Sequence, residues 1–148
     1  MKIFSVPPEQ APLSLLMLAD PSTERVLGYI NGCTVFVGEE DGATIAVAAV
    51  QQRQDEFELM AIAVAEAQQG CGLGRQMLAH VVQFAKNNGA KRVTVGTGNS
   101  SIRQQTFYQQ SGFKITGVIK NYFQDYDPPI FENGIRCLDG VRLSLVFN

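Results

Sequence analysis

The chain has 148 residues and a formal net charge of −2, with 45% hydrophobic and 18% charged residues. This length fits one domain over residues 1–148 that buries a sizeable core, and this composition excludes a disordered chain. A dedicated nucleic-acid-binding domain carries a basic excess that is absent here, so nucleic acid is not an expected partner. No apolar run reaches the roughly 18 residues that a membrane-spanning helix needs, so we expect no membrane partner.

The cysteines and the histidine favour neither a disulfide framework nor a metal site. Cys33, Cys71 and Cys137 are odd in number and widely spaced, and no C-x-x-C occurs. The single histidine, His80, lies in a helical pattern, so we expect no metal. Residues 1–8 have no secretory leader pattern, and a cytoplasmic location is expected.

Hydrophobic patterning predicts an antiparallel meander up to residue 65, then alternating helices and strands. The expected strands cover 2–6, 33–38, 43–51, 56–65, 92–95, 113–119 and 141–147. The expected helices cover 9–18, 24–29, 73 to a cap at 88–89, and a stretch from caps at 98–101 to 110, with a long loop over 120–133. These elements predict an α/β fold of the α+β type: a mixed, mostly antiparallel sheet of about six to seven strands flanked by helices.

The sharpest local feature is the segment Gln69-Gly70-Cys71-Gly72-Leu73-Gly74-Arg75, between a strand and an amphipathic helix. The first N–H groups of a helix lack internal partners, and glycines let an anion approach them closely. The pattern therefore predicts a phosphate or pyrophosphate cradle, to which Arg75 could add a contact. A tight turn without a ligand is the alternative. The P-loop and the dinucleotide fingerprint do not fit, because no Lys-Ser or Lys-Thr follows and the spacing is G-x-G-x-G.

Three segments, in this order, resemble the GNAT superfamily of acyl-CoA N-acyltransferases. Residues 69–74 match its [Q/R]-x-x-G-x-[G/A] signature, residues 58–64 resemble its fourth strand, and residues 107–113 resemble its helix end Y-x-x-x-G-F. The resemblance runs from about Glu56 to Phe113. It implies a GNAT-like fold and a coenzyme A thioester, usually acetyl-CoA, as co-substrate.

The resemblance also implies where CoA binds. Its pyrophosphate would lie on the N–H groups of residues 70–75, and its pantetheine arm would run along residues 62–64, where the fourth and fifth strands splay apart. The implied CoA-binding residues are Ile62, Ala63, Val64, Gln69, Gly70, Cys71, Gly72, Leu73, Gly74, Arg75 and Tyr108, with Asn99 or Ser101 in the place of an asparagine used by many relatives.

Acetyl transfer to an amine requires a neutral amine, a stabilised oxyanion and a leaving thiolate that is protonated or held. Tyr108 stands where the family has its catalytic tyrosine, which implies a general acid; the alternative is a hydroxyl that binds CoA or a ring that only packs. Glu58 is the expected general base, with Glu56 or ordered water as alternatives. A backbone N–H near Ile62 would hold the oxyanion. Cys71 invites an acyl-cysteine, but no histidine is local, so direct transfer is expected.

Residues 121–132 fall where the family has a substrate-side loop, and they combine three carboxylates with four aromatic residues. Carboxylates favour a cation and aromatic faces can hold one, so we expect Tyr122, Asp125 and Tyr126 to bind a small cationic amine. Candidates are a polyamine, an aminoglycoside-like compound or a lysine side chain. The alternative is a loop that packs on its own domain or on a second subunit.

The sequence therefore predicts an N-acetyltransferase that moves an acetyl group from acetyl-CoA to a primary amine. A non-catalytic acyl-CoA sensor, an interaction domain without CoA, and a protein or peptide lysine acetyltransferase stay open. Exposed edge strands near the C-terminus are compatible with a homodimer.

Overall fold

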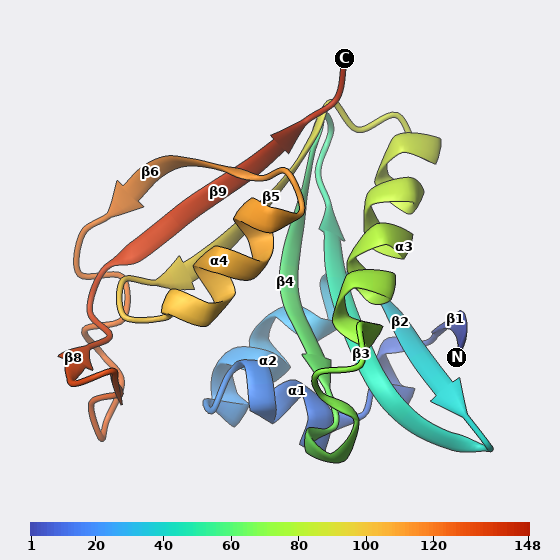
Figure 1. The fold of residues 1–148 in the computed structure, drawn as a ribbon, viewed down its shortest axis with the longest axis horizontal. Coiled ribbons are helices and arrows are strands. Elements are labelled where there is room, and N and C mark those ends of the chain that lie inside the picture. The colour runs from blue at the N-terminus through green and yellow to red at the C-terminus, as the bar shows by residue number, and fades with distance from the viewer.

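A computed structural model describes the whole of residues 1–148 and shows a seven-stranded sheet with helices on both faces (Figure 1). The strands are β1 (Lys2–Val6), β2 (Cys33–Glu40), β3 (Ala43–Gln52), β4 (Glu56–Val64), β5 (Arg92–Gly98), β6 (Lys114–Ile119), β7 (Phe131–Glu132), β8 (Ile135–Arg136) and β9 (Gly140–Val146). The helices are α1 (Leu13–Ala19), α2 (Thr23–Tyr29), α3 (Leu73–Asn87) and α4 (Ile102–Gln110), with 3₁₀ turns at Pro8–Gln10, Ile30–Gly32 and Glu66–Gln68. No helix is long and apolar enough to cross a bilayer.

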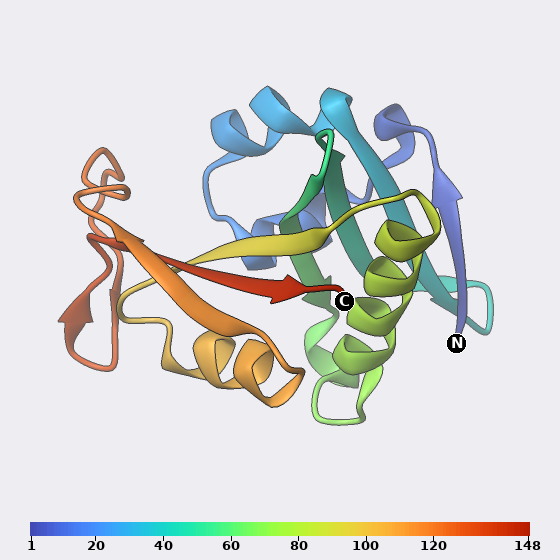
Figure 2. The same ribbon diagram turned by 90° about the horizontal axis from the view of Figure 1, so that it is seen from above.

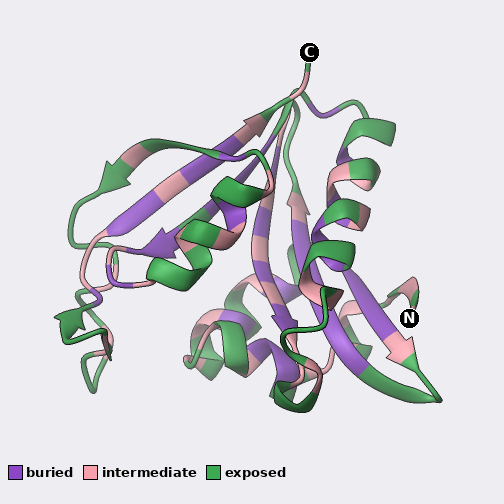
Figure 3. Ribbon diagram, viewed as in Figure 1, coloured by how far each residue is buried: buried purple, intermediate pink, exposed green.

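The strand order of the large sheet is β1-β2-β3-β4-β5-β9-β6, and β7 and β8 form a separate pair. Only the β4–β5 pair is parallel. This confirms the mixed, mostly antiparallel sheet. The edge strand β6 is exposed along most of its length (Figure 3), as expected for an edge near the C-terminus, while the homodimer stays a prediction.

The sheet separates two apolar layers. The layer under α3 and α4 contains Met77, Val81 and Tyr108, and the layer under α1 and α2 contains Leu16 and Val26. Strand β3 contributes to both layers, so its residues from 46 to 50 are all fully buried. This explains why that strand is continuously apolar instead of alternating.

Helix α3 begins and ends at glycines, as its sequence predicts. Its N-cap is Gly72, in the left-handed conformation at φ 81°. At the other end Gly89 has φ 82°, and the N–H of Ala90 donates to the carbonyl of Ala85 at 3.0 Å, which closes the helix. The apolar face between these caps packs on β3 and β4. The start of α3 is therefore held beside the end of β4.

Strands β4 and β5 pair over only part of their length. Their register runs from Glu56 opposite Arg92 to Leu59 opposite Val95, and no pair follows. Beyond that point β4 continues toward the start of α3, whereas β5 runs away from it on the side of α4, as Figures 1 and 2 show from two directions. The expected splay is confirmed, and the β4 backbone from residue 60 to residue 64 pairs only with β3.

A β-bulge at Met60 changes which side chains of β4 face each layer. Ala49 of β3 is opposite Ala61 and Val50 is opposite Leu59, so Met60 is the extra residue. Before the bulge, Leu59 packs in the α3 layer; after it, Ala61 packs in the α1 layer instead. The bulge lies where β4 leaves β5.

Two expected elements differ from the structure. The helix expected over 9–18 is a 3₁₀ turn followed by α1, which begins after Pro12. Proline lacks the N–H that a continuous helix would use there, and its carbonyl accepts from Leu15 and Leu16 instead. The loop expected over 120–133 ends in the β7–β8 hairpin, whose turn is Asn133-Gly134 with both φ angles positive. Asn-Gly is a strong hairpin signal, so the sequence contained this information.

Candidate active site

The glycine-rich segment has free backbone donors, as the predicted anion cradle requires. None of the N–H groups from Gly70 to Arg75 donates to another group of the chain, whereas the N–H of Gln76 already bonds the Gly72 carbonyl at 3.2 Å. Gly70 and Gly72 have φ of 83° and 81°, and a Cβ at either would meet open space. The donors therefore face solvent at the positive end of a 15-residue helix. This arrangement fits a pyrophosphate.

Neighbouring contacts hold the cradle against the end of β4 and against α4. Gln69 Nε2 donates to the Val64 carbonyl at 3.0 Å, and Arg75 Nη2 donates to Gln110 Oε1 at 2.9 Å. A Cβ at Gly74 would lie 3.6 Å from Phe107 and 3.9 Å from Val64, so a small residue permits this close approach. Because Arg75 is engaged with α4, its contact with an anion stays a prediction.

Tyr108 lies in the apolar layer next to the cradle. Its side chain is 4% exposed, and its ring packs on Phe107 and Phe113 with centroid distances of 5.1 and 5.5 Å. Burial raises the pKa of its phenol above the ordinary value. The hydroxyl therefore stays protonated at physiological pH and keeps a hydrogen that it can donate.

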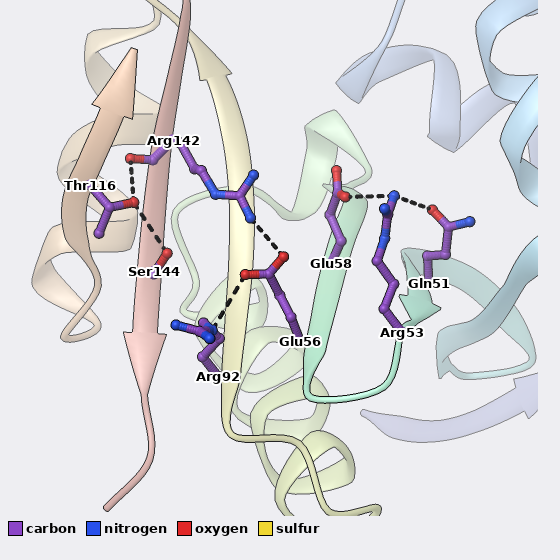
Figure 4. Close-up of polar contacts among 8 residues, drawn as sticks. All are labelled: Gln51, Arg53, Glu56, Glu58, Arg92, Thr116, Arg142 and Ser144. Atoms are coloured by element: carbon purple, nitrogen blue, oxygen red, sulfur yellow. Dashed lines mark hydrogen bonds and ion pairs between the residues drawn. The ribbon is translucent and has the colours of Figure 1, made fainter. Parts of the chain in front are cut away.

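The two candidate bases on β4 have different surroundings (Figure 4). Glu56 lies between two guanidinium groups, with Arg92 Nε at 3.4 Å and Arg142 Nη2 at 2.8 Å. Glu58 pairs with one, Arg53 Nη2 at 3.0 Å, whose own second contact is Gln51. Glu58 therefore keeps more of its acceptor capacity free for a substrate proton.

A small pocket of about 40 Å³ lies where β4 and β5 separate. Its walls include Glu58 from β4, Arg142 from β9, and Tyr122 and Phe123 from the loop after β6; Glu56 does not line it. Residues 94–97 of β5 form its floor. Two lining hydroxyls, on Thr94 and Thr97, are buried without a hydrogen-bond partner. Unpaired buried hydroxyls are costly, so these groups are candidates for bonds to a bound molecule.

Asn99 and Ser101, the two candidates for a CoA contact, hold the C-terminal segment in place. Asn99 Oδ1 accepts from the N–H groups of Leu138 and Asp139 at 2.8 and 2.9 Å, and its Nδ2 donates to the Arg136 carbonyl. The Ser101 hydroxyl donates to Glu132 at 2.7 Å. Their roles toward CoA stay predictions, since this structure gives both side chains other partners.

The residues expected to bind the acceptor are only partly at the pocket. Tyr122 lines it, whereas Asp125 is exposed outside it. Tyr126 donates from its hydroxyl to Asp20 Oδ1 at 2.8 Å. The rings of Tyr122 and Tyr126 lie against Arg25 of α2, with their centroids 5.0 and 5.1 Å from its guanidinium carbon. The loop thus packs on its own domain, an alternative that the sequence left open.

The structure thus combines free backbone donors at the start of α3, a β4 edge that β5 leaves unpaired beyond Leu59, and a pocket that includes Glu58. Residues 8–113 match the acetyltransferase (GNAT) family, and the chain belongs to that family. The uncharacterized N-acetyltransferase YvbK of Bacillus subtilis strain 168 is 41% identical over 135 residues, which cover 88% of this chain and 86% of that protein.

Solved structures agree with this assignment. An IAA acetyltransferase from Bacillus cereus has a TM-score of 0.94 at 40% identity, over 99% of each chain. A GNAT family acetyltransferase from Elizabethkingia anophelis with acetyl-CoA bound has a TM-score of 0.94 at 37% identity, over 99% of this chain and 97% of that one. The protein is therefore an acetyl-CoA-dependent acyltransferase with a GNAT fold, as the sequence predicted.

Proposed function

We propose that the enzyme transfers an acetyl group directly from acetyl-CoA to the primary amine of a small acceptor bound in the pocket at Glu58. The observation that carries this proposal is the position of Glu58, a carboxylate with one ion-pair partner, where β4 and β5 separate. The pocket of about 40 Å³ has room for a small group, such as the amine end of the acceptor.

Each residue has a role in this reaction. Residues 70–75 bind the pyrophosphate, and the unpaired edge of β4 from Ile62 to Val64 holds the pantetheine and, through a backbone N–H, the developing oxyanion. Acetyl-CoA supplies the acetyl thioester. Glu58 takes a proton from the acceptor's ammonium and passes it to solvent. The neutral nitrogen then forms its bond to the acetyl carbon as the carbon–sulfur bond breaks, and the nitrogen loses its second proton to solvent.

Tyr108 stabilises the leaving thiolate in this proposal. A thiol has an ordinary pKa of about 8.5, and burial raises the pKa of Tyr108 further above that value. Complete proton transfer from the phenol to the thiolate is therefore uphill. The phenol donates a hydrogen bond to the sulfur, and solvent supplies the proton that completes the thiol.

Direct transfer is favoured over an acyl-cysteine. Neither cysteine nor histidine lines the pocket. Burial raises the pKa of the Cys33 thiol to about 11, and the charge of Glu58 adds to this effect. A thiol that is protonated at neutral pH is a poor nucleophile.

The test compares Glu58→Gln with Asp55→Asn, a matched loss of a carboxylate just before β4, where Asp55 pairs only with the exposed Lys91. We expect Glu58→Gln to lower kcat/KM about 100-fold in a thiol-release assay with a verified amine, since general bases contribute about 100-fold or more. We expect Asp55→Asn to leave it within about threefold, because isolated surface pairs contribute little. Equal effects of both variants would refute the role of Glu58, and an unchanged acetyl-CoA Kd in both shows that the variants are folded.

A further inference from the structure

Arg142 is a pocket residue that the acetyl-transfer chemistry does not require. It lies on β9 opposite Gly96 of β5. Gly96 has no side chain, and a Cβ there would meet open space, so the Arg142 side chain can cross β5 toward β4 (Figure 4). Its guanidinium reaches Glu56 at 2.8 Å and also lines the pocket that contains Glu58. The pocket therefore has a carboxylate on one side and a guanidinium on the other.

The charges around Arg142 leave a positive excess on its side of the pocket. Glu56 is shared by Arg92 at 3.4 Å and Arg142 at 2.8 Å, so two guanidinium groups meet one carboxylate. On the other side Glu58 and Arg53 balance each other. The Arg142 guanidinium donates one hydrogen bond, to Glu56, of the five that such a group can donate. It can therefore bind a second anion without leaving Glu56.

The structure offers little to a second positive charge on the acceptor. The aromatic faces of Tyr122, Phe123 and Tyr126 already hold Arg25, at 5.0, 5.8 and 5.1 Å from its guanidinium carbon. Glu58 is the only carboxylate that lines the pocket. A polyamine would place its second ammonium near Arg142 or Arg25, where like charges repel.

An unpaired hydroxyl in the pocket points to a ligand with a polar group. Thr94 pairs with Glu58 in the β4–β5 register and is 1% exposed, and its Oγ1 has no partner. The next residue, Val95, faces the core, so Thr94 faces the opposite side of the sheet. Gly96 and its partner Arg142 lie on that same side. A ligand anion at Arg142 would bring acceptor atoms to this side of the pocket.

We propose that the acceptor is a small amino carboxylate, a free amino acid or its β- or γ-amino analogue, and that Arg142 is the residue that binds its carboxylate. The amine of this acceptor lies at Glu58, and the two charged groups of the molecule match the two charged walls of the pocket. This assignment rests on the proposed function, because it concerns the acceptor side of the same reaction.

The experiment uses acceptor pairs that differ only in a carboxylate. Suitable pairs are L-phenylalanine with 2-phenylethylamine, β-alanine with ethylamine, and γ-aminobutyrate with propylamine. For each pair, thiol release gives the ratio of kcat/KM for the acid to that for the plain amine. Because the amine pKa also differs within a pair, the diagnostic quantity is the change in this ratio between the wild type and Arg142→Gln.

We expect Arg142→Gln to lower the ratio about 10- to 100-fold for the preferred pair, through KM for the acid, as the loss of a charge-assisted hydrogen bond does. Arg142→Lys should keep part of the preference, since it keeps the charge and loses the planar fork. Arg92→Gln is the matched control, because Arg92 is the other guanidinium that pairs with Glu56 and it does not line the pocket. It should leave the ratio within about threefold.

A second measurement covers the case in which no acceptor of the panel turns over. Isothermal titration of the CoA-saturated enzyme with N-acetyl-L-phenylalanine, N-acetyl-β-alanine and their neutral amides measures carboxylate binding directly. Binding of a carboxylate but not of its amide, lost in Arg142→Gln, supports the proposal. The proposal is overturned if the enzyme prefers plain amines and Arg142→Gln leaves the ratio unchanged. It is also overturned if neither assay detects binding of a carboxylate. Loss of acetyl-CoA binding or of all acetyl transfer would instead count against the proposed function.

Discussion

A carboxylate introduced at Gly72 tests whether the cradle at the start of α3 binds the pyrophosphate. Gly72 has φ 81°, and a Cβ there would meet open space, so the new side chain of Gly72→Glu extends without a clash. Its backbone is strained by about 1–2 kcal/mol, because the left-handed region disfavours side chains. Its carboxylate lies beside the free N–H groups that follow Gly72, where it repels an anion and competes for the same donors.

The size of the effect follows from the short distance between the new charge and the cradle. Two unit charges about 5 Å apart repel by about 0.8 kcal/mol at the dielectric constant of water and about 3.3 kcal/mol at an effective value of 20. Since 1.36 kcal/mol corresponds to a factor of ten, acetyl-CoA should bind about 4- to 250-fold more weakly. The exposed cradle favours the lower half of this range.

Gly89→Glu is the matched control for this variant. Gly89 has φ 82° and equally open surroundings, and it follows the other end of the same 15-residue helix. That end lies about 22 Å from the cradle at 1.5 Å per residue, beyond the screening length at physiological salt. Isothermal titration with acetyl-CoA gives Kd for both variants and for Gly72→Ala, which has the strain without the charge. If Gly72→Glu and Gly89→Glu bind acetyl-CoA equally well, the pyrophosphate lies elsewhere.

Two further predictions concern the pocket and the tyrosines. Gly96→Val fills part of the pocket beside Arg142 without a strained φ. The acceptor KM should therefore rise about tenfold in steady-state assays, while the acetyl-CoA Kd stays within about threefold. An unchanged KM would place the acceptor elsewhere. Burial, then Asp20, raises the pKa of Tyr29 to about 12, and burial raises the pKa of Tyr108. Both phenols bind their protons more tightly in the folded protein, so the free energy of unfolding falls as pH rises above about 10. Absorbance at 295 nm, measured at pH near 11, should show less tyrosinate in the native protein than in the urea-unfolded protein. Coincident titration curves would contradict the burial of these hydroxyls.

The sequence was most informative where local chemistry determines the structure. Gly72 and Gly89 delimit α3, and Asp41-Gly42 turns the chain between β2 and β3 with positive φ at both residues. The anion cradle is local in the same sense, because it consists of consecutive N–H groups on one helix start. Its prediction therefore needed no knowledge of the tertiary structure.

Long-range partners were not predictable in this way. Arg142 bonds Glu56 across 86 residues of sequence, and the Tyr126 hydroxyl bonds Asp20 across 106. Composition suggested that the acidic and aromatic residues after β6 bind a cationic acceptor, yet Arg25 of α2 already lies against their rings. Nothing in the sequence placed α2 beside that loop. Asn99 is a similar case, since its amide bonds backbone groups of residues 136–139.

The bulge at Met60 places side chains of the same parity on opposite faces of β4. Strict alternation would place Glu58, Ile62 and Val64 on the same face of β4, because their numbers have the same parity. The extra residue breaks that rule: Ile62 and Val64 pack toward α3, whereas Glu58 lines the pocket on the other face. In the proposed reaction, an acyl group delivered along the α3 side would meet an amine held on the opposite side, at the point where β5 diverges from β4. The reaction proposed above therefore depends on the irregularity in β4, which alternation of apolar residues alone does not reveal.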